Sequence, residues 1–307
     1  MLPAPTTKSD PSPALRPISI GMPVYNGQRF LRQAIESILA QSHPNFELII
    51  SDNASTDQTA EICAEYAHRD ERIRYVRQER NIGAAANFRF VLDASRHDFF
   101  VWAACDDFRA DSFLLRTSNV LEQDETLACA LGSVIFVMDD GETIVYELHT
   151  NLLYRAGAEC SFFMAREPYF KCMLMYGLFR KEHLLAANWP LLTDTGFWWN
   201  DALFLQSIVR QGGLHMFSGA PTMYRVNWRA KVPSVSAGRG GWLLRLTGLH
   251  PVSFYLAHLR ISQGANRVLI ALLAPAKAVK SMLEFYLFAG VKVLAMARVF
   301  FRVRQRR

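Results

Sequence analysis

Short apolar segments alternate with amphipathic segments over the first hundred residues, and this alternation constrains the fold more than any other feature. The apolar segments are typical of strands buried on both faces, and the segments between them have the spacing of helices. We expect strands at residues 18–22, 46–51, 73–76 and 98–104, and helices at residues 27–41, 55–68 and 83–95. Because strictly alternating strands and helices connect through right-handed crossovers, the sequence predicts an α/β protein with a mostly parallel sheet flanked by helices.

The remaining elements are predicted from local patterns. Ser55 is expected to begin its helix as an N-cap, with Gln58 completing a capping box. Beyond Asp107 the order of elements becomes mixed. There we expect helices at 112–121, 178–187 and 201–210, an apolar stretch at 129–137, a hairpin turn at 139–142 before a strand at 143–146, and one or two strands within 214–225.

Composition and cysteine content restrict the class of protein. Hydrophobic residues make up 50% of the chain and charged residues 20%, which is typical of a globular protein. The 5 cysteines are scattered and have no paired metal-ligand spacing, so they favour a reducing compartment over a disulfide framework. Residues 1–17 are rich in proline, serine and threonine and lack the apolar core of a signal peptide, so we expect a flexible tail.

Basic charge is concentrated near the C-terminal end of the sequence. Residues 231–307 carry 13 lysines and arginines and one acid, a net charge of +12, whereas the 230 residues before them carry 21 basic and 27 acidic side chains. The basic segment is also strongly apolar, so we expect a membrane surface rather than nucleic acid as its partner. Its longest uncharged stretches fall far short of the ~20 residues that span a bilayer.

The segment from residue 277 onward has two distinct faces in helical projection. Its polar face carries Lys277, Lys280, Ser281, Glu284, Lys292, Arg298, Arg302 and Gln305. The opposite face carries Val279, Leu283, Tyr286, Val293, Leu294, Phe300 and Phe301. Such amphipathic C-terminal helices are typical of the membrane interface, and their basic residues favour an anionic cytoplasmic leaflet. A helix packed on its own domain or on a partner subunit has the same pattern, and that alternative stays open.

Two adjacent carboxylates, Asp106 and Asp107, follow the last of the four predicted strands. Open α/β sheets bind ligands at this position, outside the carboxyl ends of their strands. Because neighbouring carboxylates repel each other, a pair of them suits a cation, and oxygen ligands suit Mg²⁺ or Mn²⁺, which commonly carry phosphates. The same acids are also compatible with a helix cap or a turn.

Polar loops follow all four predicted strands. Their residues are 23–27, 51–57, 80–87 and 105–107. Since the carboxyl ends of parallel strands lie on one edge of a sheet, we expect these loops to converge.

The four motifs, in this order, closely resemble the family 2 glycosyltransferases, which have the GT-A fold. The resemblance is most specific over residues 18–115 and extends more loosely to about residue 236. It implies a glycosyltransferase domain at 18–236, between the tail at 1–17 and a basic, apolar helical segment at 237–307. Members of the family transfer a sugar from a nucleotide donor, usually with inversion and with a divalent metal, so the resemblance implies Mn²⁺ or Mg²⁺ as a cofactor.

The resemblance also implies roles for individual residues. Asp107 matches the direct metal ligand, and Asp106 matches a contact to ribose or metal. Tyr25 matches an aromatic residue that stacks near the base, and Asp52 an acid that accepts a hydrogen bond from the base, commonly uracil. The residues implied in nucleotide-sugar binding are Pro23, Tyr25, Asn26, Asp52, Asn81, Gly83 and Asp106.

Structural roles compete with several of these assignments. Tyr25 is compatible with filling a sheet edge, and Asp52 and Asn53 with forming only an Asx-turn. For Asn53, Asp57 and Asn87 we favour structural roles. Asp57 is expected to be an acid in the first turn of a helix, facing the helix dipole, and Asn87 is expected to form a hydrogen bond across the edge of the sheet.

Inverting transfer needs a base that deprotonates the acceptor hydroxyl. The resemblance places this base at Asp201, where the family typically has a Glu-Asp pair and this chain has Asn200 before the acid. A simple helix cap is the alternative for Asp201. Trp198 and Trp199 directly precede the pair, and their flat faces suit sugar rings in an acceptor site, although core packing explains them nearly as well.

A later segment, residues 224–231, lacks the histidine that many relatives use to complete the metal site. Metal binding then rests on Asp107, water and the diphosphate. Arg225, Arg229 and Lys231 are the candidates for neutralising the leaving phosphate.

The sequence therefore predicts a glycosyltransferase that uses a nucleotide-sugar donor, with a UDP-sugar favoured, and a saccharide or polyprenyl-linked saccharide acceptor. We expect it in the cytoplasm, peripherally bound at the inner face of the plasma membrane. A sugar nucleotidyltransferase is disfavoured because residues 23–27 lack a glycine-rich basic loop, and a dinucleotide dehydrogenase because no G-x-G-x-x-G follows the first strand. A non-catalytic, membrane-associated nucleotide-sugar-binding protein remains an alternative.

Overall fold

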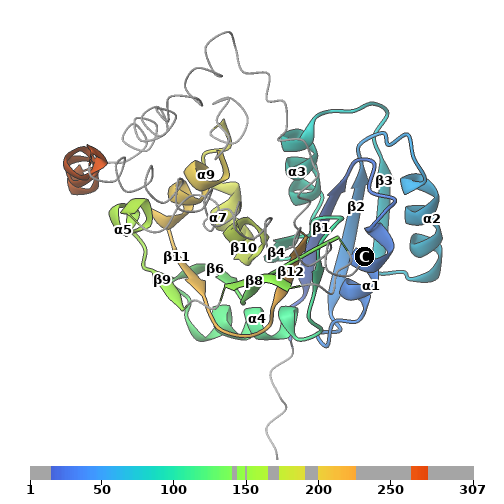
Figure 1. Ribbon diagram of the computed structural model, residues 1–307, viewed down its shortest axis with the longest axis horizontal. Helices are drawn as coiled ribbons and strands as arrows, with labels where there is room; N and C mark the ends of the chain where they lie inside the picture. Colours follow the sequence, from blue (N-terminus) through green and yellow to red (C-terminus); the bar gives the residue numbers. More distant parts are fainter. Residues whose placement is uncertain are drawn as a thin grey trace, which may run out of the picture.

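The fold contains two β-sheets with helices packed around them (Figure 1). The computed structural model describes residues 15–139, 144–148, 151–164, 173–190, 200–225 and 264–275. The predicted tail lies almost wholly outside these residues, as do the expected domain boundary near residue 236 and the amphipathic segment from residue 277 onward.

The larger sheet has eight strands in the order β3-β2-β1-β4-β10-β6-β11-β9. Its first half pairs in parallel, as the sequence predicts, and β10 then runs antiparallel between β4 and β6. The strands are β1 (Ile18–Val24), β2 (Phe46–Asp52), β3 (Ile73–Arg77), β4 (Phe99–Trp102), β6 (Leu127–Leu131), β9 (Leu152–Tyr154), β10 (Leu178–Arg180) and β11 (Gly213–Met216). Every residue of β2, β4 and β6 is buried, which is expected of strands covered on both faces.

The smaller sheet has four strands in the order β5-β12-β7-β8, namely β5 (Phe108–Arg109), β12 (Thr222–Arg225), β7 (Val134–Val137) and β8 (Ile144–Leu148). It takes in the two residues that follow the acid pair, because Met223 pairs with Phe108 and Thr222 with Arg109. The expected apolar stretch at 129–137 thus divides between two sheets, and so does the expected segment at 214–225. This sheet brings residue 225 beside the acid loop.

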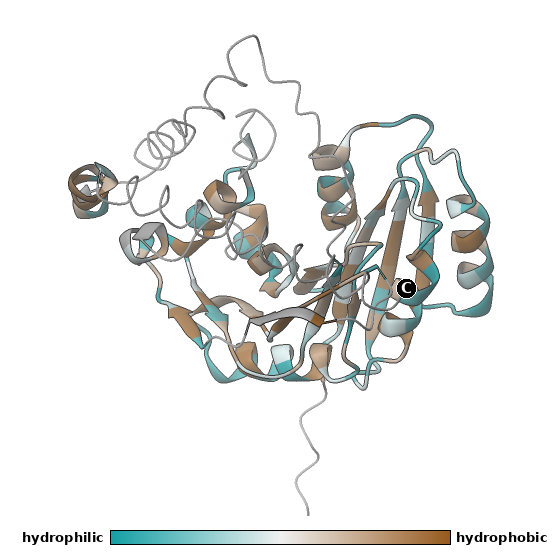
Figure 2. Cartoon of the chain, viewed as in Figure 1, coloured by the Kyte–Doolittle hydropathy of each residue, from teal (hydrophilic) through white to brown (hydrophobic). Residues whose placement is uncertain are grey.

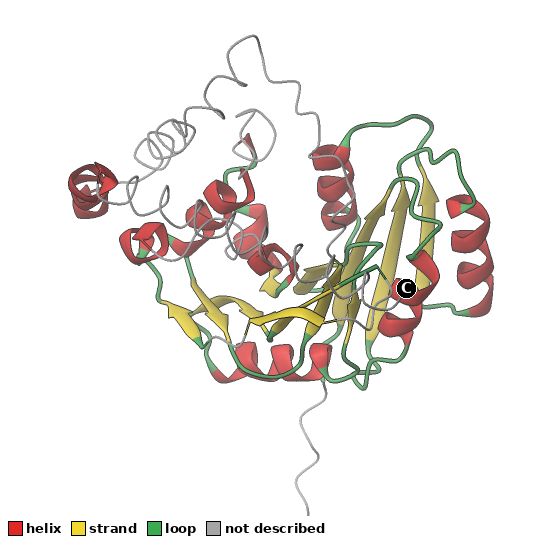
Figure 3. Cartoon of the chain, in the orientation of Figure 1, coloured by secondary structure: helices red, strands yellow, loops and turns green. Residues whose placement is uncertain are grey.

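Helices cover both faces of the larger sheet (Figure 3). They are α1 (Leu31–Leu39), α2 (Thr59–Arg69), α3 (Ala84–Asp93), α4 (Phe113–Gln123), α5 (Glu159–Met164), α7 (Lys181–Leu185), α9 (Asn200–Val209) and the short 3₁₀ helix η1 (Met173–Tyr176). Helices α1 and α2 contact each other, whereas α3 packs on β1 and β2. Hydrophobic residues gather on the strands, and hydrophilic residues lie along α2 (Figure 2).

The order in which strands are added to the sheet reverses between β1 and β4, which pair in parallel. From β1 the chain builds outward through β2 to β3, and α3 then returns it to β4 on the other side of β1. Crevices form at such switch points because the loops on either side turn to opposite faces of the sheet. The loops that follow β1 and β4 therefore flank the position where a ligand is expected.

The predicted helix at 178–187 is wrong in its first part. Residues 178–180 form β10, and helix α7 begins only at Lys181. Leu178 and Phe179 are fully buried between two strands. A short apolar run has no periodicity that separates a buried strand from a helix, so only the pairing across the sheet decides.

Residues 264–275 form one more helix, at one side of the view in Figure 1. Asn266 anchors it by donating hydrogen bonds to the Gly157 carbonyl at 2.9 Å and to Glu159 Oε2 at 3.0 Å. Its exposed apolar side chains are Val268, Leu269 and Leu272. None of the helices in the described ranges is long and apolar enough to cross a membrane.

Candidate active site

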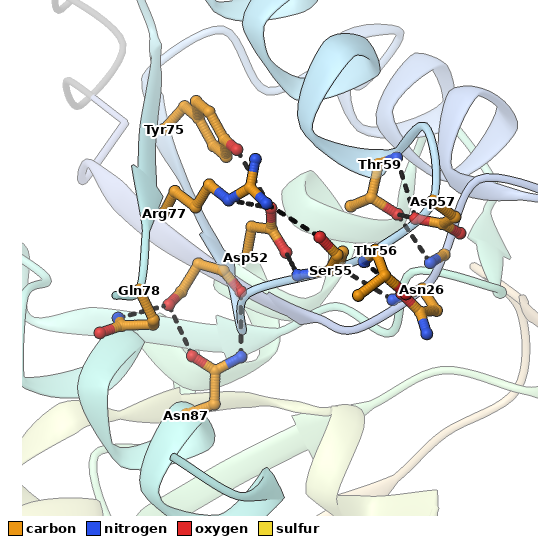
Figure 4. A network of polar contacts seen from close by, with 12 residues as sticks. Asn26, Asp52, Ser55, Thr56, Asp57, Thr59, Tyr75, Arg77, Gln78 and Asn87 are labelled. Carbon is orange, nitrogen blue, oxygen red and sulfur yellow. Dashed lines mark hydrogen bonds and ion pairs between the residues drawn. The ribbon is translucent and has the colours of Figure 1, made fainter. Parts of the chain in front are cut away.

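The loops that follow β1 and β2 are joined by side-chain hydrogen bonds (Figure 4). Asn26 has a left-handed backbone, with φ of 53°, and its Oδ1 accepts the Thr56 N–H at 2.9 Å. Its own N–H donates to Ser55 Oγ at 2.9 Å. Further bonds pair Gly27 with Thr59 and Gln28 with Asp57 and Gln58. Asn26, expected at the nucleotide, thus holds two loops together.

The predicted capping box of Ser55 and Gln58 is wrong. Helix α2 begins at Thr59, and Ser55 lies too early in the chain to cap it. Instead Asp57 Oδ1 accepts the Thr59 N–H at 3.0 Å. The Ser55 hydroxyl instead accepts a hydrogen bond from Asn26 on the neighbouring loop, so it does not bond to the helix backbone.

The loop after β3 is fixed in the same way. Asn53 Nδ2 donates to Asn81 Oδ1 at 3.0 Å, and Asn53 Oδ1 accepts the Ile82 N–H at 2.8 Å. Gly83 follows with φ of 85°, a conformation that favours glycine, and leads into α3. Asn81 and Gly83 are both exposed at this rim, and the structural role favoured for Asn53 fits these bonds.

Asn87 bonds across the sheet edge, as the structural interpretation expects. It is 2% exposed, accepts the Ser51 hydroxyl hydrogen at 2.5 Å and donates to the Ser51 carbonyl at 2.9 Å. A buried amide that forms both bonds inside the protein has little left to offer a ligand.

Replacing Asn87 with alanine is expected to lower the free energy of unfolding by about 2 kcal/mol, because the buried hydroxyl and carbonyl of Ser51 each lose a hydrogen bond. Nucleotide affinity of the folded protein should stay unchanged. Denaturant unfolding measures the first quantity and calorimetric titration the second. Asn45→Ala removes an exposed amide with one hydrogen bond and serves as the control. A folded N87A protein that no longer binds nucleotide would contradict the structural role.

Asp52 ends β2 and is fully buried. Its Oδ1 accepts the Ser55 N–H at 2.9 Å, and its Oδ2 accepts the Tyr75 hydroxyl at 3.1 Å. The Arg77 Nε lies 3.8 Å from the same Oδ2 (Figure 4). By contrast, Tyr25 directly follows β1 and is 49% exposed, and Pro23 near the end of β1 is partly exposed, so both are open to a ligand.

Asp106 and Asp107 differ sharply in their surroundings. Asp106 is exposed, whereas Asp107 is 7% exposed and its Oδ1 accepts the Arg225 N–H at 2.9 Å. Burial raises the pKa of Asp107 to about 8, and the neighbouring charge of Asp106 adds to the rise. The pair therefore combines one solvent-facing and one buried carboxyl group.

Arg225 ties the acid loop to two other elements. Its Nη1 donates to the Asp106 carbonyl at 2.7 Å, and its Nη2 donates to Gln33 on α1. The guanidinium stacks on Phe30, with 4.2 Å to the ring centroid, and is buried. Because its contacts are to protein atoms, Arg225 is placed to position the acids; the other two basic candidates, at 229 and 231, lie outside the described residues.

A second buried guanidinium, Arg109, joins β4 to η1. Its Nη2 donates to the Trp102 carbonyl at 2.5 Å and to the Tyr176 carbonyl at 3.2 Å. Burial lowers the pKa of Arg109 to about 10. The sequence analysis missed Arg109, although an arginine two residues after a carboxylate pair is a signal that was available.

Asp201 lies in the first turn of α9, and its Oδ1 accepts the Ala202 N–H at 3.0 Å. Asp201 and the acid pair both influence the pKa of Tyr176. Burial raises the pKa of Tyr176, and the nearby Tyr224 together with Asp107, Asp106 and Asp201 raises it further. The three carboxylates therefore act electrostatically on the same hydroxyl, while Trp198 and Trp199 lie outside the described residues.

A model of glycosyl transferase family 2 matches residues 19–232. The chain belongs to this family. An uncharacterized glycosyltransferase of Haemophilus influenzae is 35% identical over 127 residues, which are 41% of this chain and 50% of that protein. TuaG of Bacillus subtilis, whose given name proposes a role in teichuronic acid biosynthesis, is 37% identical over 90 residues, 29% of this chain and 36% of that protein. The chain spans half or less of the length of these relatives.

Solved structures show the same fold. TarS residues 1–349 from S. aureus give a TM-score of 0.60 at 15% identity, covering 88% of this chain and 72% of that chain. The complex of TarS 1–349 with UDP-GlcNAc gives 0.56 at 15% identity, covering 82% and 69%. The predicted family and the predicted GT-A fold, a mostly parallel sheet flanked by helices, are therefore confirmed.

The carboxylates of this family 2 chain fit a hard divalent cation, but only partly enclose one. Asp107 has one oxygen on the Arg225 N–H and a second oxygen without a hydrogen bond among the described residues, and Asp106 is open to solvent. No cluster of three or more potential ligand side chains exists in the described part of the chain. Two carboxylates suit Mg²⁺ or Mn²⁺ when a diphosphate and water complete the shell.

Proposed function

We propose that the protein is an inverting glycosyltransferase that uses a nucleotide-sugar donor, with UDP-sugars favoured. The observation that carries this proposal is the acid pair Asp106 and Asp107, which follows β4 and is held by Arg225 at the edge where the loops after β1, β2 and β3 also end. Family membership and the UDP and UDP-GlcNAc complexes of TarS support the class of donor.

The chemistry follows from the roles of the chain's own groups. Asp201 accepts the proton of the acceptor hydroxyl as that oxygen attacks the anomeric carbon from the face opposite the leaving group. Asp107 and Asp106 would hold a divalent ion, which when bound supplies positive charge against the departing nucleoside diphosphate. Tyr25 offers its exposed ring to the base, and Pro23, Asn81 and Gly83 shape the rim around it.

The proposed acceptor is a saccharide or a polyprenyl-linked saccharide in cell-surface polysaccharide assembly. The name of TuaG and the basic, apolar C-terminal segment support this choice. We place the protein in the cytoplasm, bound peripherally to the inner face of the plasma membrane. The helix at 264–275 lies within that segment and exposes apolar side chains to solvent.

Binding of donors is expected to raise the thermal unfolding temperature in a screen of nucleotide sugars. A UDP-sugar should raise it by several degrees with Mn²⁺ and less without, because bound ligand stabilises only the folded state. ADP- and GDP-sugars are the controls. A protein that binds a UDP-sugar and never releases UDP with any glycan acceptor would instead be a non-catalytic binding module. Release of pyrophosphate from UTP and a sugar phosphate would indicate a nucleotidyltransferase.

Membrane binding is expected to appear in sedimentation with vesicles that contain phosphatidylglycerol. Most of the protein should pellet at low salt and return to the supernatant at high salt, because basic groups supply much of the attraction. Replacing Leu269 and Leu272 with aspartate should weaken binding roughly tenfold. Leu185→Asp, which changes an equally exposed leucine on α7, is the control. Protein that stays in the supernatant at low salt would contradict the proposal.

A further inference from the structure

Asp52 is closed to a ligand. Its side chain is 0% exposed, and each carboxylate oxygen already accepts a hydrogen bond, one from the Ser55 N–H and one from the Tyr75 hydroxyl. Because no part of the Asp52 side chain is exposed, the carboxylate has no open side for the edge of a base. The role that the family resemblance implies for this acid therefore needs another residue at the surface.

Arg77 occupies that surface. Its side chain is 51% exposed, yet it is held from two sides: Nη2 donates to the Ser55 carbonyl at 2.9 Å, and Nε lies 3.8 Å from Asp52 Oδ2. A guanidinium carries five N–H donors in a rigid plane and has no acceptor. Because few of these donors are used inside the protein, the remainder face outward in a fixed orientation.

Ser55 connects this guanidinium to the loop that carries the exposed aromatic ring. Its carbonyl accepts from Arg77, and its hydroxyl accepts the N–H of Asn26, the residue after Tyr25. Figure 4 shows Arg77 and Asn26 reaching Ser55 from opposite sides. Ser55 thus bonds both the guanidinium and the loop that carries the exposed ring, and a ring with a set of oriented donors suits a flat base whose edge carries acceptors.

We propose that Arg77 reads the nucleobase of the donor through a carbonyl oxygen, and that Asp52 and Tyr75 are positioning residues that hold Arg77 in place. This inference rests on the proposed function, which makes the ligand a nucleotide sugar. A guanidinium selects uracil over cytosine because the uracil O4 is an acceptor, whereas cytosine presents an amino group at the same position.

The test compares the affinities for UDP and CDP by calorimetric titration of the full chain with Mn²⁺ present. The wild-type protein should bind UDP at least tenfold more tightly than CDP. Arg77→Gln should weaken UDP binding roughly 10- to 100-fold, the range for a hydrogen bond from a charged group, and change CDP binding by less than threefold. Arg77→Lys, which keeps the charge and loses the planar fork, should also lose discrimination.

Two controls match the arginine and tyrosine changes. Arg155 is 65% exposed, has one ion pair to Asp124 at 3.3 Å, and follows β9 at the edge of the sheet opposite to β3, so Arg155→Gln should leave both affinities unchanged. Tyr75→Phe removes only the hydroxyl that closes Asp52 and should lower the UDP-to-CDP ratio severalfold. Tyr66→Phe removes a hydroxyl bonded to Glu36 and should not change that ratio.

The outcomes separate this inference from the proposed function. Equal losses of UDP and CDP affinity in Arg77→Gln would show a phosphate or ribose contact and would overturn base reading by Arg77. Asp52 would read the base directly if the Arg77→Gln protein kept the preference for UDP over CDP while a folded Asp52→Asn protein lost it. Either result leaves the glycosyltransferase proposal standing. A wild-type protein that binds neither nucleotide would overturn the proposed donor class and this inference together.

Discussion

Replacing Asp201 with asparagine is expected to lower the turnover number roughly 10²- to 10⁴-fold, the usual contribution of a general base. The amide keeps the size of the side chain and still accepts the Ala202 N–H, so α9 should begin as before. The reason for the loss is chemical: an amide cannot take the proton from the attacking hydroxyl. Nucleotide affinity should remain within about twofold, because only the proton acceptor is lost. Steady-state release of nucleoside diphosphate and calorimetric titration with UDP measure the two quantities.

A matched control for this change is Glu182→Gln. Glu182 is an exposed acid in the first turn of α7, so it shares the helix position of Asp201 but does not contribute to the pKa shift of Tyr176. Its replacement should leave the turnover number unchanged. A D201N protein that keeps more than a tenth of wild-type turnover would assign Asp201 to helix capping alone.

Replacing Asp107 with asparagine is expected to abolish measurable turnover and the effect of metal on UDP binding. Asparagine keeps an oxygen for the Arg225 N–H at the position where Asp107 accepts it at 2.9 Å, so the fold should persist. The change removes a carboxyl group that can ionise and bind a divalent ion, and an amide cannot lose a proton in this way. The measurement is the dissociation constant of UDP as a function of Mn²⁺ concentration, with thermal unfolding as a check of the fold.

The pKa of Asp107 sets the direction of the pH dependence in the same experiment. Burial and the Asp106 charge raise this pKa to about 8, so without metal the carboxyl group is protonated at neutral pH. A metal ligand must lose its proton, so metal-dependent UDP binding should strengthen as the pH rises from 6 to 8, with proton release. Without metal, stability from the neutral carboxyl group is present at low pH and is lost as the pH rises through 8. Unchanged metal dependence in D107N would refute a ligand role.

Sequence patterns predicted the parallel half of the larger sheet because each strand there is followed by its own helix. They failed where contacts between residues far apart in sequence determine the secondary structure or the geometry of the site. Residues 178–180 become a strand only by lying between β4 and β6, and the Arg225 N–H reaches Asp107 across 118 positions of sequence. No local pattern records either arrangement.

The sequence predicted which loops converge at the edge of the sheet, but not the hydrogen bonds that their side chains form. Asn26 and Asn81 stand at the expected strand ends, but their side chains bond neighbouring loops. An asparagine in a loop motif offers the same donor and acceptor to a ligand or to a backbone group, so its type cannot separate the two uses. Arg77 was overlooked because an isolated arginine at a strand end carries no motif.

Hydrogen bonds among the loops that follow β1, β2 and β3 separate residues that hold the loops in place from residues that can be substituted. The side chains of Asn26, Asn53 and Asp57 form hydrogen bonds from one loop to the next. A substitution at these positions would therefore destabilise the loops before it changed the preference for a substrate. Tyr25 and Ile82 project outward from these loops. Redesign of the donor preference would therefore begin at these two exposed positions, where substitutions destabilise the loops least.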